Sequence, residues 1–175
     1  MEKLVLEKID KKDFEYFYEI MEEAFPEDEH RNKDEQRKLF KEELYNVSGY
    51  KKNNEVIGFI AYWDFDGFDY IEHFAVKRSY RNKSIGSTLL KKFLDRRKKK
   101  VILEVEYPED KITVSRINFY KRIGFYLNDY EYIQPSYEIG RNEIPLKIMS
   151  YKNLIGEDEY NEFKNSVYAN VYKCI

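Results

Sequence analysis

The stretch from Ile71 to Leu90 holds the residue pattern most able to do chemistry. An apolar strand pattern runs into a short polar loop, and a helix pattern begins at Ser84–Ser87, where small side chains leave the backbone N–H groups uncovered. The first four N–H groups of a helix lack partners within it, and the positive end of the helix dipole lies there, so this terminus is suited to bind an anion such as a diphosphate. The stretch lacks the Gly-Lys-Ser/Thr of a nucleoside-triphosphate loop and the two-glycine dinucleotide fingerprint.

Two glutamates in strand patterns are candidates for proton transfer. Glu104 stands between two apolar residues in a strand that we expect to be covered on both faces, and burial would raise its pKa toward that of a useful general base. The alternative is a strand end that points to solvent beside Glu106. Glu72 is the rival base, because strand alternation puts it on the same face as Tyr70 and Phe74. The sequence does not choose between the two.

The histidines and the cysteine carry less chemistry. By the same alternation His73 faces the side opposite Glu72, and we interpret it as a core histidine. With only two histidines, His30 and His73, and one cysteine, Cys174, the chain has no metal-ligand constellation, so no metal is expected. A single cysteine forms no internal disulfide and does not ask for an oxidising compartment.

The Ile71–Leu90 stretch resembles motif A of the GCN5-related N-acetyltransferase (GNAT) superfamily, whose pattern is Arg/Gln-x-x-Gly-x-Gly/Ala. Arg81, Gly86 and the spacing match, while Ser84 replaces the first glycine. Further on, Phe119–Phe125 matches the motif B signature Tyr-x-x-x-Gly-Phe, with Thr113 at the place of an asparagine that is usual there. The two motifs occur in the order of strand, loop, helix, strand and helix that is typical of the family.

The resemblance implies acetyl-CoA as cosubstrate and assigns roles to residues. The backbone of Phe74–Val76 would pair with the pantetheine arm as if it were an added strand. Tyr120 would protonate the departing thiolate, and Glu104 or Glu72 would take the amine proton; core packing with the hydroxyl at the rim is the alternative for Tyr120. The predicted cofactor-binding residues are Phe74, Ala75, Val76, Arg81, Asn82, Lys83, Ser84, Ile85, Gly86, Ser87 and Thr113.

The implied function is N-acetyltransferase activity that moves the acetyl group of acetyl-CoA to a primary amine, expected to be that of a small molecule. Direct attack by the amine is expected, since Cys174 has no histidine nearby in sequence to activate it. The alternatives are a non-catalytic acyl-CoA sensor and an acetyltransferase for protein lysines or N-termini. The segment Gln134–Tyr137 is expected near the acceptor. Acidic residues near the end of the first helix favour a cationic amine, or form a solvated turn: Glu22, Glu23, Glu27, Asp28 and Glu29.

We expect the chain to form a mixed α/β fold with a seven-stranded, mostly antiparallel sheet flanked by helices. The strand ending at Val76 and the one starting at Val101 are joined by a helical crossover, so we expect them to be parallel, and splayed toward Glu106 to admit acetyl-CoA. Strands are predicted at 3–9, 47–52, 55–64, 68–76, 101–106, 125–133 and 144–151. Helices are predicted after residue 10, at 34–45, from residue 85, at 112–123 and, as a C-terminal amphipathic helix, at 156–173.

Local signals set several of these boundaries. Asp10 with Asp13 three positions later is a capping-box pattern, and Pro26 ends the helix that follows. Gly124 stands where a left-handed C-cap favours glycine. In the second helix, the side chains expected to point inward are Leu39, Phe40 and Leu44.

Length and charge set the outer limits. A chain of 175 residues suits one domain, 1–175. Its 33 acidic and 31 basic residues nearly cancel, which argues against a nucleic-acid binder, and we interpret the basic run Arg96–Lys100 as a solvated helix end. The apolar run Val56–Trp63 is too short to span a bilayer, and the N-terminus is no signal peptide. We therefore expect a cytoplasmic monomer or homodimer with no membrane partner.

Overall fold

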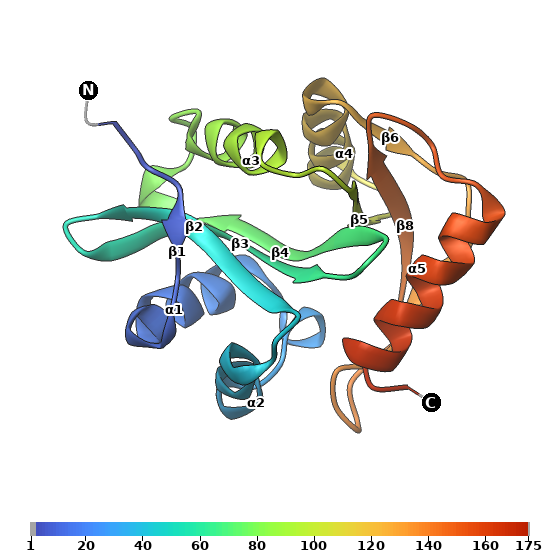
Figure 1. The fold of residues 1–175 in the computed structure, drawn as a ribbon, viewed down its shortest axis with the longest axis horizontal. Helices are drawn as coiled ribbons and strands as arrows, with labels where there is room; N and C mark the ends of the chain where they lie inside the picture. The colour runs from blue at the N-terminus through green and yellow to red at the C-terminus, as the bar shows by residue number, and fades with distance from the viewer. Residues whose placement is uncertain (1–2, 175) are drawn as a thin grey trace.

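The computed structural model describes residues 3–174, which form a mixed α/β fold (Figure 1). The elements in chain order are β1 (Glu7–Lys8), α1 (Phe14–Ala24), α2 (Lys33–Lys38), β2 (Tyr45–Lys52), β3 (Glu55–Asp64), β4 (Phe68–Val76), α3 (Ile85–Asp95), β5 (Lys100–Glu106), α4 (Lys111–Ile123), β6 (Phe125–Leu127), β7 (Tyr132–Gln134), β8 (Ile144–Tyr151) and α5 (Glu157–Asn170). Short 3-10 turns lie at Lys11–Asp13, Glu27–Glu29, Leu39–Lys41 and Arg78–Tyr80.

The sheet is mostly antiparallel, as predicted. Its strand order is β1-β2-β3-β4-β5-β8-β6, with β7 also paired to β8. The β4–β5 pair is parallel, and the other strand pairs are antiparallel. Antiparallel neighbours need only a tight turn, whereas the parallel pair needs the crossover through α3. The prediction for this crossover is confirmed.

The sheet has eight strands, not the predicted seven, because the segment 125–133 is split. Its two parts, β6 and β7, both pair with β8. Between the pairs Leu127↔Met149 and Tyr132↔Leu146, the β6–β7 side has residues 128–131, whereas β8 has only residues 147–148. The extra residues bulge out. Buried Asn128 holds this bulge, because its Oδ1 accepts from the Ile155 N–H at 2.9 Å and its Nδ2 donates to Ser150 Oγ at 2.9 Å.

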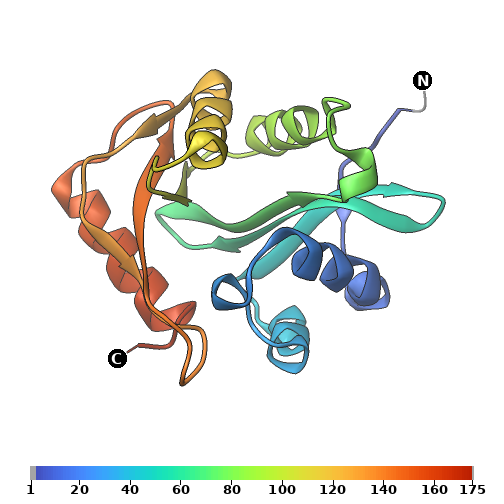
Figure 2. The same cartoon turned by 180° about the vertical axis from the view of Figure 1, so that it is seen from behind.

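Helices cover both faces of the sheet (Figures 1 and 2). α3 and α4 lie on one face, while α1 and α2 lie on the other, and α5 packs beside β8. The apolar stripes predicted at spacings of three and four are buried: Leu89, Leu90, Phe93 and Leu94 in α3, and Phe14, Phe17 and Met21 in α1. Phe163 and Val167 of α5 belong to the same core cluster as α1.

Two N-terminal predictions are corrected. The strand predicted at 3–9 contains only β1, which pairs with β2 through Glu7 and Lys8. The helix predicted at 34–45 is shorter: α2 ends at Lys38, and a 3-10 turn follows to Lys41. It goes no further because Tyr45 already pairs with Trp63 in the sheet and the Leu44 carbonyl accepts from the Asp64 N–H. As a result Leu44 is exposed rather than inward, whereas Leu39 is buried as predicted.

The predicted caps are confirmed. Asp10 and Asp13 form a capping box that starts a 3-10 turn, and α1 continues from it. Gly124 ends α4 at φ +118, a left-handed conformation that side chains with a Cβ rarely adopt. The C-terminal helix is α5, which lies within the predicted range 156–173. In the part of the chain that the structure describes, no helix is both long and apolar enough to cross a membrane.

Candidate active site

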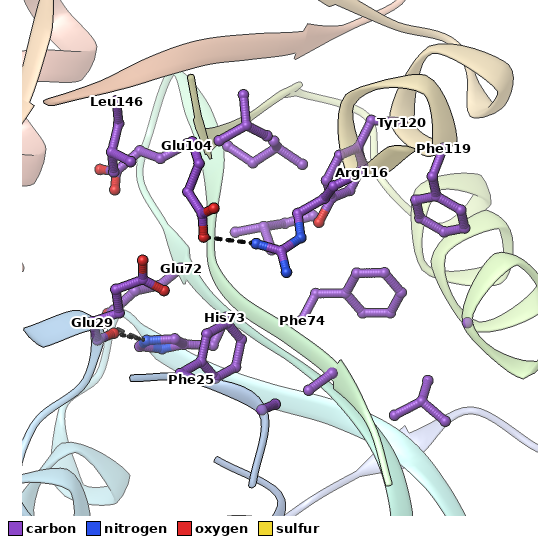
Figure 3. Close-up of a pocket in the computed structure, with 18 of the residues that line it drawn as sticks. Phe25, Glu29, Glu72, His73, Phe74, Glu104, Arg116, Phe119, Tyr120 and Leu146 are labelled. Atoms are coloured by element: carbon purple, nitrogen blue, oxygen red, sulfur yellow. Dashed lines mark hydrogen bonds and ion pairs between the residues drawn. The ribbon is translucent and has the colours of Figure 1, made fainter. Parts of the chain in front are cut away.

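A cleft opens where β4 and β5 part. Their pairing runs from Phe68↔Lys100 to Ile71↔Leu103 and goes no further, so the ends of both strands diverge. The cleft has a volume of about 370 Å³ and is lined by β4, β5, α4 and the segment around Glu29 (Figure 3). The predicted splay is therefore present. Beyond Ile71, the edge of β4 that faces β5 has no strand beside it in the ladder.

One end of the cleft is the N-terminus of α3. Ser84 is the N-cap residue, with φ +59 and no capping bond from its side chain. The first helical bond is Thr88 N–H to the Ser84 carbonyl at 3.1 Å, so the N–H groups of Ile85, Gly86 and Ser87 precede it and have no intrahelical acceptor. Ser84 takes the left-handed conformation in which glycine is least strained, at the place of the first glycine of the motif.

Arg81 and Gly86 bring this end to the cleft, which both residues line. Arg81 Nε donates to the Val76 carbonyl at 2.9 Å, which fixes its guanidinium beside the free edge of β4. A Cβ on Gly86 would meet Phe74 and Val76 at 3.4 and 3.5 Å, so the helix passes close to the strand here. Lys83 Nζ donates to the Ser79 carbonyl at 3.2 Å within the same loop.

Five of the predicted cofactor-binding residues line the cleft, namely Phe74, Ala75, Val76, Arg81 and Gly86. Asn82, Lys83, Ser84, Ile85 and Ser87 lie in the loop and first turn beside them. Thr113 is placed differently: it forms a capping box with Asp110, the N-cap residue of α4. Its hydroxyl accepts from the backbone N–H groups of Glu109 and Asp110, and its own N–H donates to the Asp110 side chain. Thr113 is not among the residues that line the cleft.

A β-bulge in β4 changes the predicted faces of Glu72 and His73. The pairs Ala61↔His73 and Tyr62↔Ile71 leave Glu72 as the extra residue. The bulge shifts the alternation by one, so His73 lies on the side of Phe25 and its Nδ1 is 3.5 Å from Glu72 Oε2. The expectation that the two residues face opposite sides was wrong. Phe74, in turn, packs near Tyr120 on the other face and not beside Glu72.

Glu72 is a buried and paired anion. Its Oε2 is 2.6 Å from Arg31 Nη1 and accepts from the Tyr137 hydroxyl at 3.1 Å, while Oε1 accepts from Trp63 Nε1 at 2.7 Å. Burial alone would raise the pKa of Glu72, but the Arg31 guanidinium, His73 and these hydrogen bonds hold it below its usual value. The carboxylate therefore stays charged.

His73 is buried as well, and burial lowers its pKa. Its Nε2 is 2.7 Å from the Glu29 backbone carbonyl, the contact drawn as a dashed line in Figure 3. Because a carbonyl only accepts, Nε2 carries the hydrogen and a neutral ring satisfies this bond. His73 thus acts as a structural link between β4 and the segment after α1.

Glu104 is half-buried in the cleft, and among residues 3–174 it forms no ion pair. Its Oε1 accepts from the Tyr132 hydroxyl at 2.6 Å, and the Tyr172 hydroxyl lies 3.0 Å from Oε2 and 3.2 Å from Oε1. Burial raises the pKa of the Glu104 carboxyl to about 7, against the lowering effect of these phenols, and the charge of Glu72 adds to the rise. A carboxyl that titrates near neutral pH in a cleft is suited to accept a proton.

Tyr120 of α4 is the third predicted catalytic residue, and it lines the same cleft as Glu72 and Glu104 (Figure 3). Its ring packs against Phe119 and Phe125 at centroid distances of 5.3 and 5.6 Å. Burial raises the pKa of its phenol to about 12, so the hydroxyl is protonated at neutral pH. Among residues 3–174 this hydroxyl forms no hydrogen bond, which leaves it free to donate to a ligand.

The mouth of the cleft carries further charges that the sequence did not reveal. Arg116 Nη1 forms an ion pair with Glu106 Oε1 at 2.9 Å. Burial and the nearby Glu106 raise the pKa of Glu29 to about 7. The sequence also gave no signal for Tyr132 and Tyr172, because tyrosine occurs 17 times in the chain and neither lies in a motif.

The loop between β7 and β8 also contributes to the wall of the cleft. Gln134 and Tyr137 of the predicted segment line the cleft. The loop is tied to the segment after α1: Arg141 Nη1 donates to the Glu27 carbonyl at 2.6 Å and also to the His30 carbonyl. Further bonds join Asn142 to Asp28 and Glu138 to Asn32. We call residues 134–142 the acceptor loop.

Within the described range 3–174, no group of three or more His, Cys, Asp or Glu side chains is placed to hold a metal ion. The cleft is lined by carboxyl and phenol side chains, and the backbone N–H groups of the α3 terminus lie at one end of it. These groups fit a thioester cosubstrate that carries a diphosphate, since the α3 terminus offers unpaired donors and β4 offers a free strand edge.

Comparisons with known proteins agree with this geometry. The family model described as "Acetyltransferase (GNAT) family" matches residues 14–125. The chain is 30% identical over 111 residues to YjbC, a candidate acetyltransferase of Bacillus subtilis (strain 168); the match covers 62% of this chain and 56% of that protein. The chain thus spans just over half the length of this curated relative.

Two solved structures are similar over most of their length. A candidate acetyltransferase of the GNAT family from Bacteroides thetaiotaomicron is 32% identical with a TM-score of 0.89, over 98% of this chain and 99% of that one. The yncA structure from Salmonella typhimurium, a candidate acetyltransferase solved with its cofactor acetyl-CoA, has a TM-score of 0.64 at 18% identity, over 89% of this chain and 97% of that one. The second likeness concerns the fold alone.

Proposed function

The chain belongs to the acetyltransferase (GNAT) family, as its motifs predicted, and on that premise we propose that it transfers the acetyl group of acetyl-CoA to the primary amine of a small molecule by direct attack. Acetyl-CoA-dependent acyl transfer follows from family membership. The amine acceptor and the roles of individual residues are the proposal. The observation that carries it is a half-buried carboxyl, Glu104, whose pKa is raised to about 7 in the cleft between β4 and β5.

Acetyl-CoA supplies the activated thioester, and the chain holds it at two places. The N–H groups of Ile85, Gly86 and Ser87 receive the diphosphate, with the positive charge of Arg81 beside them. The free edge of β4 at Phe74–Val76 binds the pantetheine arm through backbone hydrogen bonds. The acyl end then lies between the two diverging strands.

Glu104 takes the proton of the acceptor amine. A cationic amine must lose a proton before it attacks, and a carboxyl whose pKa lies near the working pH is present partly in the ionised form that accepts one. Glu72 is less suited to this task, because Arg31 and Trp63 occupy its oxygens and lower its proton affinity. The geometry therefore favours Glu104 over its rival.

Tyr120 donates a hydrogen bond or a proton to the departing sulfur. Its phenol is protonated at neutral pH, lines the cleft and has no other hydrogen bond among the described residues. A phenol packed between aromatic rings also has little freedom to turn away, and such positioning lowers the barrier.

A small cationic acceptor suits the part of the cleft beside the acceptor loop. The acceptor loop is bonded to the segment after α1 through Arg141 and Asn142, so this part is bridged rather than an open groove for a polypeptide. Carboxylates outnumber cations along the cleft, where Glu29, Glu72, Glu104 and Glu106 face Arg81 and Arg116. An ammonium ion is therefore attracted, and the aromatic walls offer cation–π contacts.

Two alternatives remain to be separated by experiment, a non-catalytic acyl-CoA sensor and an acetyltransferase for protein lysines or N-termini. Isothermal calorimetry with acetyl-CoA, followed by a thiol-release assay over small amines and lysine peptides, distinguishes all three. The proposal expects binding together with amine-dependent thiol release that is faster with small cationic amines than with peptides. Binding without release would identify a sensor, and faster release with peptides would identify a protein acetyltransferase.

A further inference from the structure

Tyr172, near the C-terminus, contacts the carboxyl of Glu104. It lies in the turn after α5, its side chain is buried, and its hydroxyl is 3.0 Å from Oε2 and 3.2 Å from Oε1 of Glu104. The family model matches residues 14–125 only, so the family assignment gives Tyr172 no role. The contact joins two segments that are far apart in sequence, β5 and the end of the chain.

The structure fixes Tyr172 from several sides. Its N–H donates to the Val167 carbonyl at 3.2 Å, which continues the last turn of α5. The neighbouring Val171 carbonyl accepts from Arg31 Nη2 at 2.8 Å, and Arg31 is itself held by its ion pair with Glu72. The position of the Tyr172 hydroxyl therefore depends on a buried ion pair and not on a free chain end.

The two carboxyl oxygens of Glu104 have different hydrogen-bond partners. Oε1 accepts from the Tyr132 hydroxyl at 2.6 Å and lies 3.2 Å from the Tyr172 hydroxyl, whereas the nearest phenol to Oε2 among residues 3–174 is that of Tyr172, at 3.0 Å. Tyr70 also lies within hydrogen-bonding reach of this carboxyl. A carboxylate offers about two acceptor positions on each oxygen, so Oε2 keeps one for a further donor. The Tyr70 hydroxyl is 3.3 Å from that of Tyr172 and completes a chain of phenols at this carboxylate.

Resting on the proposed function, we propose that Tyr172 is a positioning residue, which holds the Glu104 carboxylate so that Oε2 keeps a free acceptor position for the amine. Tyr172 itself touches neither substrate nor thioester in this role. The titratable groups near Glu104 are Tyr70 and Glu72 of β4, Tyr132 of β7, Tyr137 of the acceptor loop, Tyr168 of α5 and Tyr172 of the C-terminal turn.

The variant Tyr172→Phe removes the hydroxyl and keeps the ring. A phenol donor favours the charged carboxylate, so its loss raises the pKa of Glu104 further. The acid limb of kcat/KM for the amine then moves to higher pH by about one unit, and below that limb kcat/KM falls about tenfold. The affinity for acetyl-CoA and the melting temperature stay near parental values, because neither the α3 terminus nor the core packing changes.

A readout without turnover accompanies the pH profile. The ¹³C chemical shift of the Glu104 carboxyl is followed against pH in glutamate-labelled protein, with Glu104→Gln to assign the signal. Its midpoint is expected to rise by about one unit in Tyr172→Phe. The matched control is Tyr160→Phe, which removes a hydroxyl of α5 that bonds the Glu131 carbonyl at 2.9 Å and leaves Glu104 untouched.

The outcomes separate this inference from the proposed function. A Glu104 midpoint in Tyr172→Phe equal to the parental one would overturn the inference, whatever the activity. A protein that no longer folds would assign the hydroxyl to stability and overturn it too. If the Glu104 midpoint shifts in Tyr172→Phe but the acid limb of kcat/KM does not, the result supports the positioning role of Tyr172 and contradicts Glu104 as the base. If the midpoint and the acid limb both shift in Tyr172→Phe, and neither shifts in Tyr160→Phe, the result supports the inference and the proposed function.

Discussion

The Arg31 guanidinium lies 2.6 Å from the Glu72 carboxylate, and the two side chains are 8% and 0% exposed. This ion pair sits on the β-bulge of β4 at the wall of the cleft, and its arginine also binds the Val171 carbonyl at the end of the chain. The pair therefore joins β4, the segment after α1 and the C-terminal turn. It gives Glu72 a structural role, whereas Glu104 and Glu29 are the cleft carboxyls whose pKa is raised to about 7.

The variant Glu72→Gln should lower the stability of the fold more than the catalytic activity. Removing one partner of a buried pair leaves the Arg31 charge uncompensated, which costs about 3–5 kcal/mol. The pKa of Glu72 is lower in the folded protein than the unfolded value near 4.5, so the pair adds its full stability only above that value and loses it as the pH falls through the folded pKa. The difference in stability between the parent and Glu72→Gln should therefore shrink in acid. Urea unfolding at pH 7 and pH 4 measures this.

The double variant Glu72→Gln with Arg31→Gln is the control for that prediction. It removes both charges, so it should lose clearly less than the sum of the two single changes. Equal and additive losses would mean that the two side chains act independently.

Gly86→Glu should abolish the stabilisation of the protein by acetyl-CoA. A carboxylate at the first turn of α3 occupies the anion site and repels the diphosphate. The parent should gain about 2.7 kcal/mol at a hundredfold excess over the dissociation constant. Thermal melts with and without acetyl-CoA give the answer, and NAD and ATP should not match it.

Gly86→Ala is the matched control, because its Cβ meets only Phe74 and Val76 at ordinary contact distances of 3.4 and 3.5 Å. It should keep most of the acetyl-CoA shift. If Gly86→Glu folds and binds acetyl-CoA as tightly as Gly86→Ala, the diphosphate binds elsewhere.

Tyr120→Phe should slow the chemical step and leave binding unchanged. The variant keeps the ring that packs on Phe119 and Phe125 and removes only the hydroxyl at the cleft. General acids contribute 10²–10⁴-fold, and a thiolate leaves readily, so we expect a loss of roughly tenfold to a few hundredfold in kcat. Rate and acetyl-CoA affinity are measured on one preparation. Unchanged turnover would make Tyr120 a packing residue.

Arg141→Ala should loosen the acceptor loop and weaken the binding of the amine but not that of acetyl-CoA. The change removes the bonds of this side chain to the Glu27 and His30 carbonyls, so we expect KM for the amine to rise about tenfold while the affinity for acetyl-CoA is kept. Lys147→Ala is the control, since its ion pair with the exposed Asp129 lies away from these contacts. A rise in KM for acetyl-CoA would show that the loop does not serve the acceptor.

The sequence predicted well those elements whose signals are local. Strands β3, β4 and β8 have the predicted bounds, because turn pairs such as Asn53-Asn54 and a strict change of hydrophobic period mark their ends. The caps at Asp10 and Gly124 followed from side-chain size and hydrogen bonding alone. Motif A placed the free helix terminus correctly even with Ser84 in the place of glycine.

What the sequence could not give depends on partners distant in the chain. The bulge at Glu72 is a shift in the register between β3 and β4. It places His73 on the face of the sheet opposite to the predicted one. The phenols at Glu104 come from β7 and from the C-terminal turn, which no spacing rule connects to β5. The split of β6 from β7 depends likewise on the buried bonds of Asn128.

The most direct test of the account compares the parent with Glu104→Gln in amine-dependent thiol release from pH 5.5 to 9. Since the folded pKa of Glu104 is near 7, parental kcat/KM should fall below about pH 7 as the carboxyl takes up a proton. Glu104→Gln keeps the size of the side chain, so it should show the same melting shift with acetyl-CoA while its kcat/KM falls about 10²–10⁴-fold and loses that acid limb. An unchanged rate in Glu104→Gln, with acetyl-CoA still bound, would contradict the account.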